Sequence, residues 1–274
     1  MKKNILKYCT VFATFLLAYA CSKKDGVTNQ PYQTYGISST QGFIKINYAS
    51  AYFANPTVLL KINDQIVSSL ITGRTPFPGG GYNTNGSSFA LYLSVPQGTN
   101  TLSIVRPKVG TGLDSIVLYT ATFNIPDTMP YTLHITDTLV NATSNNTKQV
   151  LIKNIINYVD TGSCRFRFVN LIPNVTAVDL YLNGILMKSN ISYLQATDTF
   201  TVTTGFRAPS YATFPTPTWA VRAAGSAATS PVIASYAATT TLQSQAVITI
   251  FSMGYSGLTG TRLPYLCFTL DKNQ

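Results

Sequence analysis

After about residue 40, the chain is dominated by short runs in which apolar and polar residues alternate, separated by turn-forming residues. In one run, Arg167 would face water while Phe166 and Phe168 on either side face a core. The pair Asn183-Gly184 is typical of a tight hairpin, because both residues accept the positive φ angles of a type I′ turn. Many short strands punctuated by Gly, Pro and Asn predict an all-β fold built from β-sandwiches.

The runs form two similar series, which indicates an internal repeat. The matching runs, first series before second, are 58–64 with 178–184, 115–123 with 231–238, 131–135 with 247–251, and 149–153 with 265–270. We therefore expect two tandem modules, residues 36–158 and 159–274. Each has about 115–130 residues, which is enough for a core of its own.

The second module opens with Arg-Phe-Val-Asn-Leu-Ile-Pro at 167–173, then Ala-Val-Asp-Leu-Tyr-Leu-Asn-Gly at 177–184. This combination resembles the opening signature of an uncharacterised domain-of-unknown-function family found, often in tandem, in secreted and lipid-anchored proteins of Bacteroidetes type. The resemblance covers about residues 163–270 directly and the first module only through the repeat, where Leu59 replaces the signature Asp. It implies immunoglobulin-like sandwiches in the cell envelope. It implies no activity, because that family brings none.

The first 20 residues predict a cleaved signal peptide, with a basic start and then an apolar run at 8–20. Such a run is too short to span a bilayer, which needs roughly 20 residues. Cys21 follows at once, as in a bacterial lipoprotein signal, and that resemblance implies that Cys21 carries lipid. An ordinary signal with an incidental cysteine is the alternative. We expect residues 21–35 to tether the chain to the outer membrane, since Ser22 stands where inner-membrane lipoproteins have Asp.

Composition removes most enzyme chemistries from consideration. The 274 residues include nine Asp, no Glu and one histidine, His134. A Ser-His-Asp hydrolase would depend on His134, which lies in an alternating run and is expected to point outward as an inert surface side chain. The sequence also lacks the paired carboxylates of glycosidases, clustered zinc ligands and phosphate-binding loops. We expect no catalytic residue, no metal and no cofactor.

The charge balance is basic but diffuse. The net charge is +10, and loss of the signal peptide with its three lysines lowers it to +7. Because the basic residues are spread along the chain rather than gathered in a run, a nucleic-acid partner is not expected.

The modules differ most in two long loops, residues 72–86 and 205–219, which combine Gly or Pro with aromatic residues and an arginine. Loops on a rigid sandwich commonly carry binding sites, and aromatic rings suit sugars and peptide side chains. The candidate ligand-binding residues are Arg74, Tyr82, Arg207, Tyr211 and Trp219. Packing into the core is the alternative, most seriously for Trp219.

Apart from Cys21, two cysteines remain after the signal peptide is removed, Cys164 and Cys267. They lie on the first and last predicted strands of the second module, which are often neighbours. A disulfide there would contribute about 4–5 kcal/mol in the chain-entropy model. Two separately buried thiols are the alternative.

Together these patterns predict a lipid-anchored, non-catalytic binding or adhesion protein at the outer-membrane surface. Its ligand would be a glycan or an envelope or matrix protein. One alternative is a periplasm-facing scaffold that holds a protein partner, and another is a hydrolase of unknown type.

Overall fold

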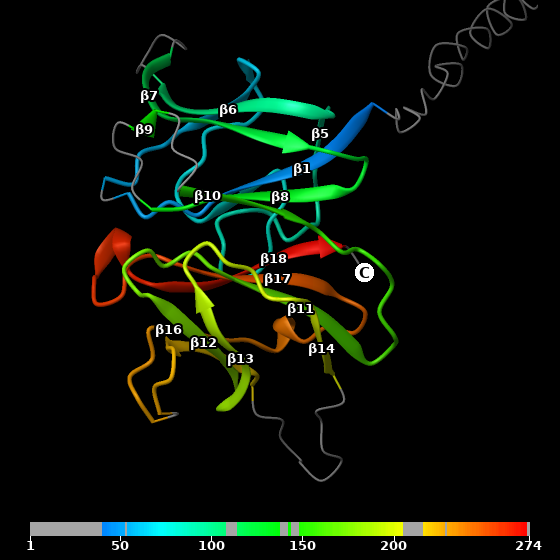
Figure 1. Ribbon diagram of the computed structural model, residues 1–274, viewed down its shortest axis with the longest axis vertical. Coiled ribbons are helices and arrows are strands. Elements are labelled where there is room, and N and C mark those ends of the chain that lie inside the picture. The colour runs from blue at the N-terminus through cyan, green and yellow to red at the C-terminus, as the bar shows by residue number, and fades with distance from the viewer. Residues whose placement is uncertain are drawn as a thin grey trace, which may run out of the picture. The chain divides into compact units, whose positions relative to one another are not determined.

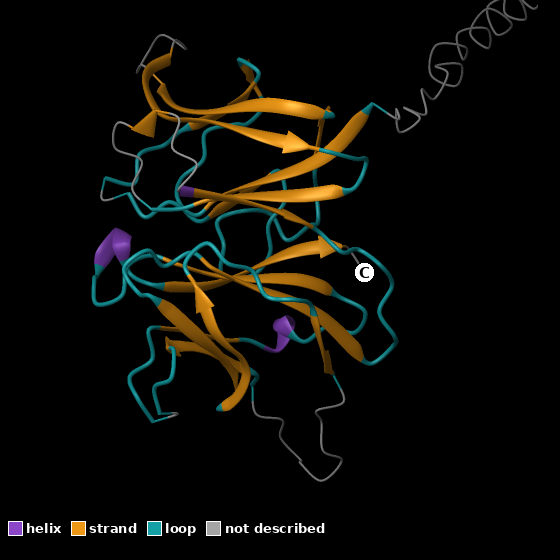
Figure 2. Ribbon diagram, in the orientation of Figure 1, coloured by secondary structure: helices purple, strands orange, loops and turns teal. Residues whose placement is uncertain are grey.

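The computed structural model describes residues 40–52, 54–107, 114–137, 142–143, 148–204, 216–227 and 229–272. These residues form strands and short 3-10 turns, among them η3 (Thr239–Thr241) and η4 (Gly260–Arg262), with no α-helix in the described part (Figure 2). The predicted all-β class is therefore confirmed. No helix within the described ranges has the length and apolar character needed to cross a membrane.

Residues 40–154, here called the N-terminal half, contain the first ten strands. These are β1 (Gln41–Tyr48), β2 (Leu59–Ile62), β3 (Gln65–Ile66), β4 (Thr75–Phe77), β5 (Leu93–Pro96), β6 (Gly98–Pro107), β7 (Asp114–Ile125), β8 (Pro130–Ile135), β9 (Ala142–Thr143) and β10 (Gln149–Lys153). One sheet has the order β10-β8-β1-β4, with β5 also paired to β1, and the other has the order β3-β2-β6-β7-β9. Apolar side chains from both sheets, such as Ile46 and Ile104, meet in one core.

Residues 163–272, the C-terminal half, contain the remaining strands. These are β11 (Ser163–Asn170), β12 (Ala177–Leu182), β13 (Ile185–Ser192), β14 (Phe200–Thr203), β15 (Thr218–Ala223), β16 (Ala234–Ala237), β17 (Val247–Met253) and β18 (Tyr265–Lys272). They form two sheets with the orders β14-β11-β17-β18 and β13-β12-β15-β16. The core between these sheets is rich in aromatic rings, including Phe166, Trp219 and Phe268.

The two halves repeat one strand order. In each, the first strand pairs in parallel with a later one, β1 with β8 and β11 with β17, and the last strand then pairs antiparallel with that later one. The predicted hairpin is present as well, since Asn183 and Gly184 have φ of 50° and 79° between β12 and β13. The predicted alignment of residues 131–135 with 247–251 is wrong by one residue. It pairs Leu133, which faces the core of the N-terminal half, with Thr249, which faces away from the core of the C-terminal half.

Residues 39–274 form one compact unit, in which the sheet with β1, β8 and β10 lies beside the sheet with β11, β17 and β18 (Figure 1). The central strands of these two inner sheets are buried on both faces. A third apolar cluster lies between the halves and joins Ala49 and Ile152 to Val169 and Phe251. The strands that read as half-exposed in the sequence are therefore interior strands, and β8 and β17 are buried at every position.

A segment of the N-terminal half, residues 79–83, covers the outer edge of β18. We call this segment the strap. Its backbone pairs with β18 through Tyr82 N to Phe268 O at 2.9 Å, Phe268 N to Tyr82 O at 3.0 Å and Leu270 N to Gly80 O at 2.8 Å. A Cβ on Gly81 would lie 2.0 Å from Phe268 O, so this approach requires glycine. The strap therefore supplies hydrogen-bond partners for backbone groups along the outer edge of β18.

Candidate functional site

The structure places the candidate ligand-binding residues in three different settings. Arg207 and Tyr211 lie outside the described residues. Trp219 is not a ligand-binding residue, because its side chain is fully buried in the C-terminal core, 4.9 Å from the Phe166 ring by centroids. Its indole Nε1 donates to Thr241 Oγ1 at 3.1 Å, so the polar atom of this side chain has its hydrogen-bond partner inside the protein.

Tyr82 belongs to the strap rather than to an open loop. Its ring packs against the C-terminal core, and its hydroxyl donates to Gln243 Oε1 at 2.9 Å. The adjacent Asn83 donates through Nδ2 to Leu266 O at 2.8 Å. This part of the predicted ligand-binding loop therefore holds one half of the protein to the other.

Cys164 and Cys267 are free thiols in the structure, so the disulfide alternative is not supported. Strand β17 lies between β11 and β18, which separates the two cysteines in the sheet. They also face opposite sides, because Cys164 is in the C-terminal core and Cys267 is in the cluster between the halves. Burial raises the pKa of the Cys164 thiol to about 12, so it is not a reactive group.

His134 is fully buried, and the prediction of an outward surface histidine is wrong. It does point away from the N-terminal core, but the C-terminal half covers that face. Asn47 Nδ2 donates to His134 Nδ1 at 2.8 Å, and the Phe251 ring meets the imidazole edge to face at 5.9 Å. Burial lowers the pKa of His134 to about 3, and the nearby cations Lys45 and Arg167 act in the same direction.

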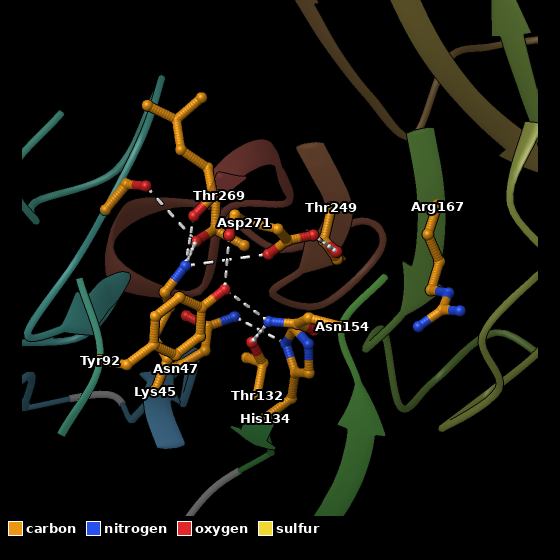
Figure 3. A network of polar contacts seen from close by, with 12 residues as sticks. Lys45, Asn47, Tyr92, Thr132, His134, Asn154, Arg167, Thr249, Thr269 and Asp271 are labelled. Atoms are coloured by element: carbon orange, nitrogen blue, oxygen red, sulfur yellow. Dashed lines mark hydrogen bonds and ion pairs between the residues drawn. The ribbon is translucent and has the colours of Figure 1, made fainter. Parts of the chain in front are cut away.

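The largest polar feature that the sequence did not reveal is a buried network between the halves (Figure 3). At its centre Lys45, on β1, lies 3.8 Å from Asp271 Oδ1, on β18, and both side chains are at most 5% exposed. Lys45 Nζ donates to Thr269 Oγ1 at 3.1 Å and to the carbonyl of Leu270. Thr249 Oγ1 donates to Asp271 Oδ2 at 2.6 Å.

A second branch of the network crosses between the halves through Tyr92. Its ring lies under Lys45 Nζ at 4.7 Å, and its hydroxyl donates to the backbone oxygen of Asp271 at 2.8 Å. Asn154 Nδ2 donates to the same hydroxyl at 2.9 Å and to Thr132 Oγ1 at 2.8 Å. The only sequence signal for this network is a lysine within the otherwise uncharged run of β1.

Burial controls the electrostatics of the central pair. It lowers the pKa of Lys45 to about 8, although the Asp271 carboxylate opposes this shift. Burial also raises the pKa of Asp271, against the effect of Lys45. Both shifts favour uncharged forms, as expected for ionisable groups that water does not reach.

An open cleft of about 340 Å³ lies where the two halves meet, at the lower end of the size range of small-ligand sites. Its lining residues come from both halves: Ser50, Asn55, Gly73, Arg74, Asn85, Met253, Gly260, Thr261 and Tyr265. None of these residues is acidic. A second cleft of about 330 Å³, bordered by Leu70 and Phe77, shares Asn85 with the first.

Arg74 gives the first cleft its charge. Its guanidinium lies over the Tyr265 ring at 4.2 Å, and its Nη2 donates to Asn85 Oδ1 at 3.2 Å. Within the described residues Arg74 has no acidic partner, and its buried Nε has no hydrogen-bond partner. Its backbone has φ of 66°, a left-handed conformation that favours glycine. The arrangement can accept a negatively charged group, because a guanidinium carries five donors and most of these are unused.

The described residues contain no group of three or more His, Cys or Asp side chains placed to hold a metal ion. Asp127, for example, accepts from Met129 N at 2.9 Å and pairs with Lys153 at 2.6 Å, which is the role of a turn-capping residue.

Comparison with protein-family models gives no match to this chain, and comparison with curated proteins gives none either. Among solved structures, one match is a leucine-rich repeat protein from Bacteroides thetaiotaomicron, with 11% sequence identity and a TM-score of 0.18. The match covers 77% of this chain and 26% of that one, so the chain spans about a quarter of its length. A TM-score of this size does not indicate a shared fold.

The burial of His134 predicts acid destabilisation. Between pH 6.5 and pH 3 the unfolded chain binds a proton that the folded protein excludes. Stability is therefore fully present above pH 6.5 and falls as the pH falls, by about 1.4 kcal/mol per unit inside that window. Denaturant titrations at several pH values measure this slope.

The matched control for this slope is His134→Gln, which keeps a hydrogen-bonding side chain but does not titrate. Asp271 is the same in both proteins, so any contribution from its raised pKa cancels and the difference between the two slopes isolates the histidine. Equal slopes in the two proteins would show that His134 does not become harder to protonate on folding.

The strap predicts a structural role for Tyr82. Replacement by alanine removes the packing against the C-terminal core and the hydrogen bond to Gln243, and should lower the free energy of unfolding by about 2–3 kcal/mol. Tyr82→Phe keeps the packing and should cost about 1 kcal/mol. Urea denaturation measures both. An alanine variant as stable as the parent would return Tyr82 to the list of ligand-binding residues.

Proposed function

We propose that this chain is a lipid-anchored, non-catalytic binding protein of the bacterial cell envelope, held at the outer-membrane surface through Cys21. In this proposal its halves are tandem immunoglobulin-like modules joined into one rigid body, residues 36–158 and 159–274. The ligand is a negatively charged one, an acidic envelope or matrix glycan in the first place, and it enters the cleft beside Arg74.

One observation carries the choice of site. Arg74 presents a cation in a cleft whose lining residues include no acid, and it does so from a backbone conformation that costs about 1 kcal/mol for a residue other than glycine. Strain of this kind is found where a side chain has a role beyond packing. The stack on Tyr265 also fixes the guanidinium before a ligand arrives, which lowers the entropy lost on binding.

The setting of His134 supports a non-catalytic role over the hydrolase alternative. Its imidazole is sealed between the halves, with Asn47 on Nδ1 rather than a carboxylate, and its low pKa makes it a poor base at neutral pH. Reaction chemistry at this residue would require the two halves to separate.

A second candidate function is the periplasm-facing scaffold, and the edge strand β13 favours it. This strand lies at the end of its sheet order, and its residues Ile185 and Leu186 are about half exposed. Apolar residues on a strand at the end of a sheet suit the addition of a strand from a partner protein.

Protease shaving of intact cells that carry a C-terminal epitope tag separates these two functions. Loss of the epitope, while a periplasmic control protein stays protected, is expected for a surface binding protein. Protection until the outer membrane is broken would contradict surface location. A search for cross-linked periplasmic partners of β13 would then be the next step.

The cleft makes a specific prediction for Arg74→Gly. Glycine accepts φ of 66° without cost, so stability should change by about 1 kcal/mol or less even though the stack on Tyr265 is lost. Retention on immobilised uronic-acid oligosaccharides should fall at least about tenfold, because Arg74 is the one cation among the described residues that line the cleft.

The matched control is Arg222→Ala, which removes one positive charge and one arginine–tyrosine contact elsewhere, over the Tyr181 ring at 5.6 Å. It should leave retention unchanged. A neutral oligosaccharide of the same length tests whether charge is what the cleft recognises. Equal loss in both variants would mean that the net charge of the protein, and not the cleft, attracts the ligand.

A further inference from the structure

The central pair of the buried network has an unusual geometry for an ion pair. Lys45 Nζ lies 3.8 Å from Asp271 Oδ1, too far for a hydrogen bond, and instead donates to Thr269 and to the Leu270 carbonyl. Within the described residues, Asp271 Oδ1 has no hydrogen-bond partner, although it is buried. One carboxyl oxygen is thus unsatisfied beside an amine that is held in place by other groups.

We propose that Lys45 and Asp271 are the site of an intramolecular isopeptide bond, an amide that links Lys45 Nζ to Asp271 Cγ across the two halves (Figure 3). The bond requires no ligand at the cleft beside Arg74.

The hydrogen-bond pattern suits the product better than the ion pair. Asp271 Oδ1, which has no hydrogen-bond partner, is the oxygen that leaves. Oδ2 remains as the amide oxygen and keeps the hydrogen bond from Thr249, while the new amide N–H keeps the carbonyl of Leu270 as its acceptor. The product carries no charge, so the cost of burying an ammonium and a carboxylate disappears.

The reaction balances without any other reactant. A proton passes from the Lys45 ammonium to the Asp271 carboxylate, which gives a neutral amine and a carboxylic acid. The amine lone pair attacks Cγ, the bond from Cγ to Oδ1 breaks, and Oδ1 leaves as water with one hydrogen from the acid and one from the amine. The Thr249 hydroxyl, 2.6 Å from Oδ2, stabilises the oxygen on which negative charge develops.

The surroundings favour this step. Burial moves the pKa values of both groups toward the neutral forms that react, down to about 8 for Lys45 and upward for Asp271. Lys45 Nζ is held 3.8 Å from Asp271 Oδ1. Fixing two reacting groups close together corresponds to an effective concentration on the order of 10⁵ M or more, when their orientation is favourable. The Tyr92 ring over the amine limits access of the water that would reverse the reaction.

Peptide mapping of the mature protein, digested with trypsin after denaturation, tests the bond. Trypsin does not cleave after an acylated lysine, so residues 25–61 should appear joined to residues 263–272, at the sum of the two peptide masses less one water. Fragmentation of this branched species should place the link at Lys45 and Asp271. Complete recovery of three separate peptides, residues 25–45, 46–61 and 263–272, would show cleavage after Lys45 and would overturn the proposal.

The chain supplies an internal control, the pair Lys153 and Asp127. Its nitrogen and oxygen are closer, at 2.6 Å, but both side chains are exposed and charged, so this pair should remain unlinked. A branched peptide at both pairs would mean that the digest, not the buried site, forms the bond. Lys45→Met and Asp271→Ala should each abolish the branched species, but the result for the unchanged protein decides the question even if these variants fail to fold.

Discussion

The structure depends on a lysine that water does not reach. Lys45 lies on the face of β1 that points away from its own core, and its polar partners Thr269, Leu270 and Asp271 all belong to the other half. Before Lys45 and Asp271 are linked, removing one member of the pair leaves an unpaired charge in the interior, at a cost of about 3–5 kcal/mol. The halves are therefore required to dock in one register, because any other register would leave the Lys45 charge buried without a partner.

The same requirement explains the strap and the cleft beside it. Once β18 has docked against the N-terminal half, its outer edge is within reach of residues 79–83, which pair with it as an added strand. The chain leading into the strap then passes Arg74, whose guanidinium rests on Tyr265 at the start of β18. The cleft thus exists only because the halves are joined, and its charge is set by residues from the N-terminal side.

Sequence reasoning reached the strands, their repeated order and the turn at Asn183, because alternation and turn chemistry are local properties. The sequence-based predictions were wrong where one half of the protein covers a face of the other. Lys45 and His134 alternate with apolar residues in the way that solvent-facing residues do, and nothing local shows that another half covers them. The structural role of Tyr82 was missed for the same reason, since its hydrogen-bond partner Gln243 is distant in sequence. Arg74 was a candidate because it lies among glycines and prolines, and the structure places it in the lining of the first cleft. Its role in ligand binding stays a prediction.

The most direct test of this account is whether the two halves unfold together. Trp219, the single tryptophan, lies in the C-terminal core, so its fluorescence reports that half alone, while hydrogen exchange at β1 and β8 reports the other. The account predicts that both signals change over the same range of denaturant concentration, in one cooperative transition. Loss of protection in β1 and β8 while Trp219 keeps its native emission would show that the halves are independent domains and would contradict it.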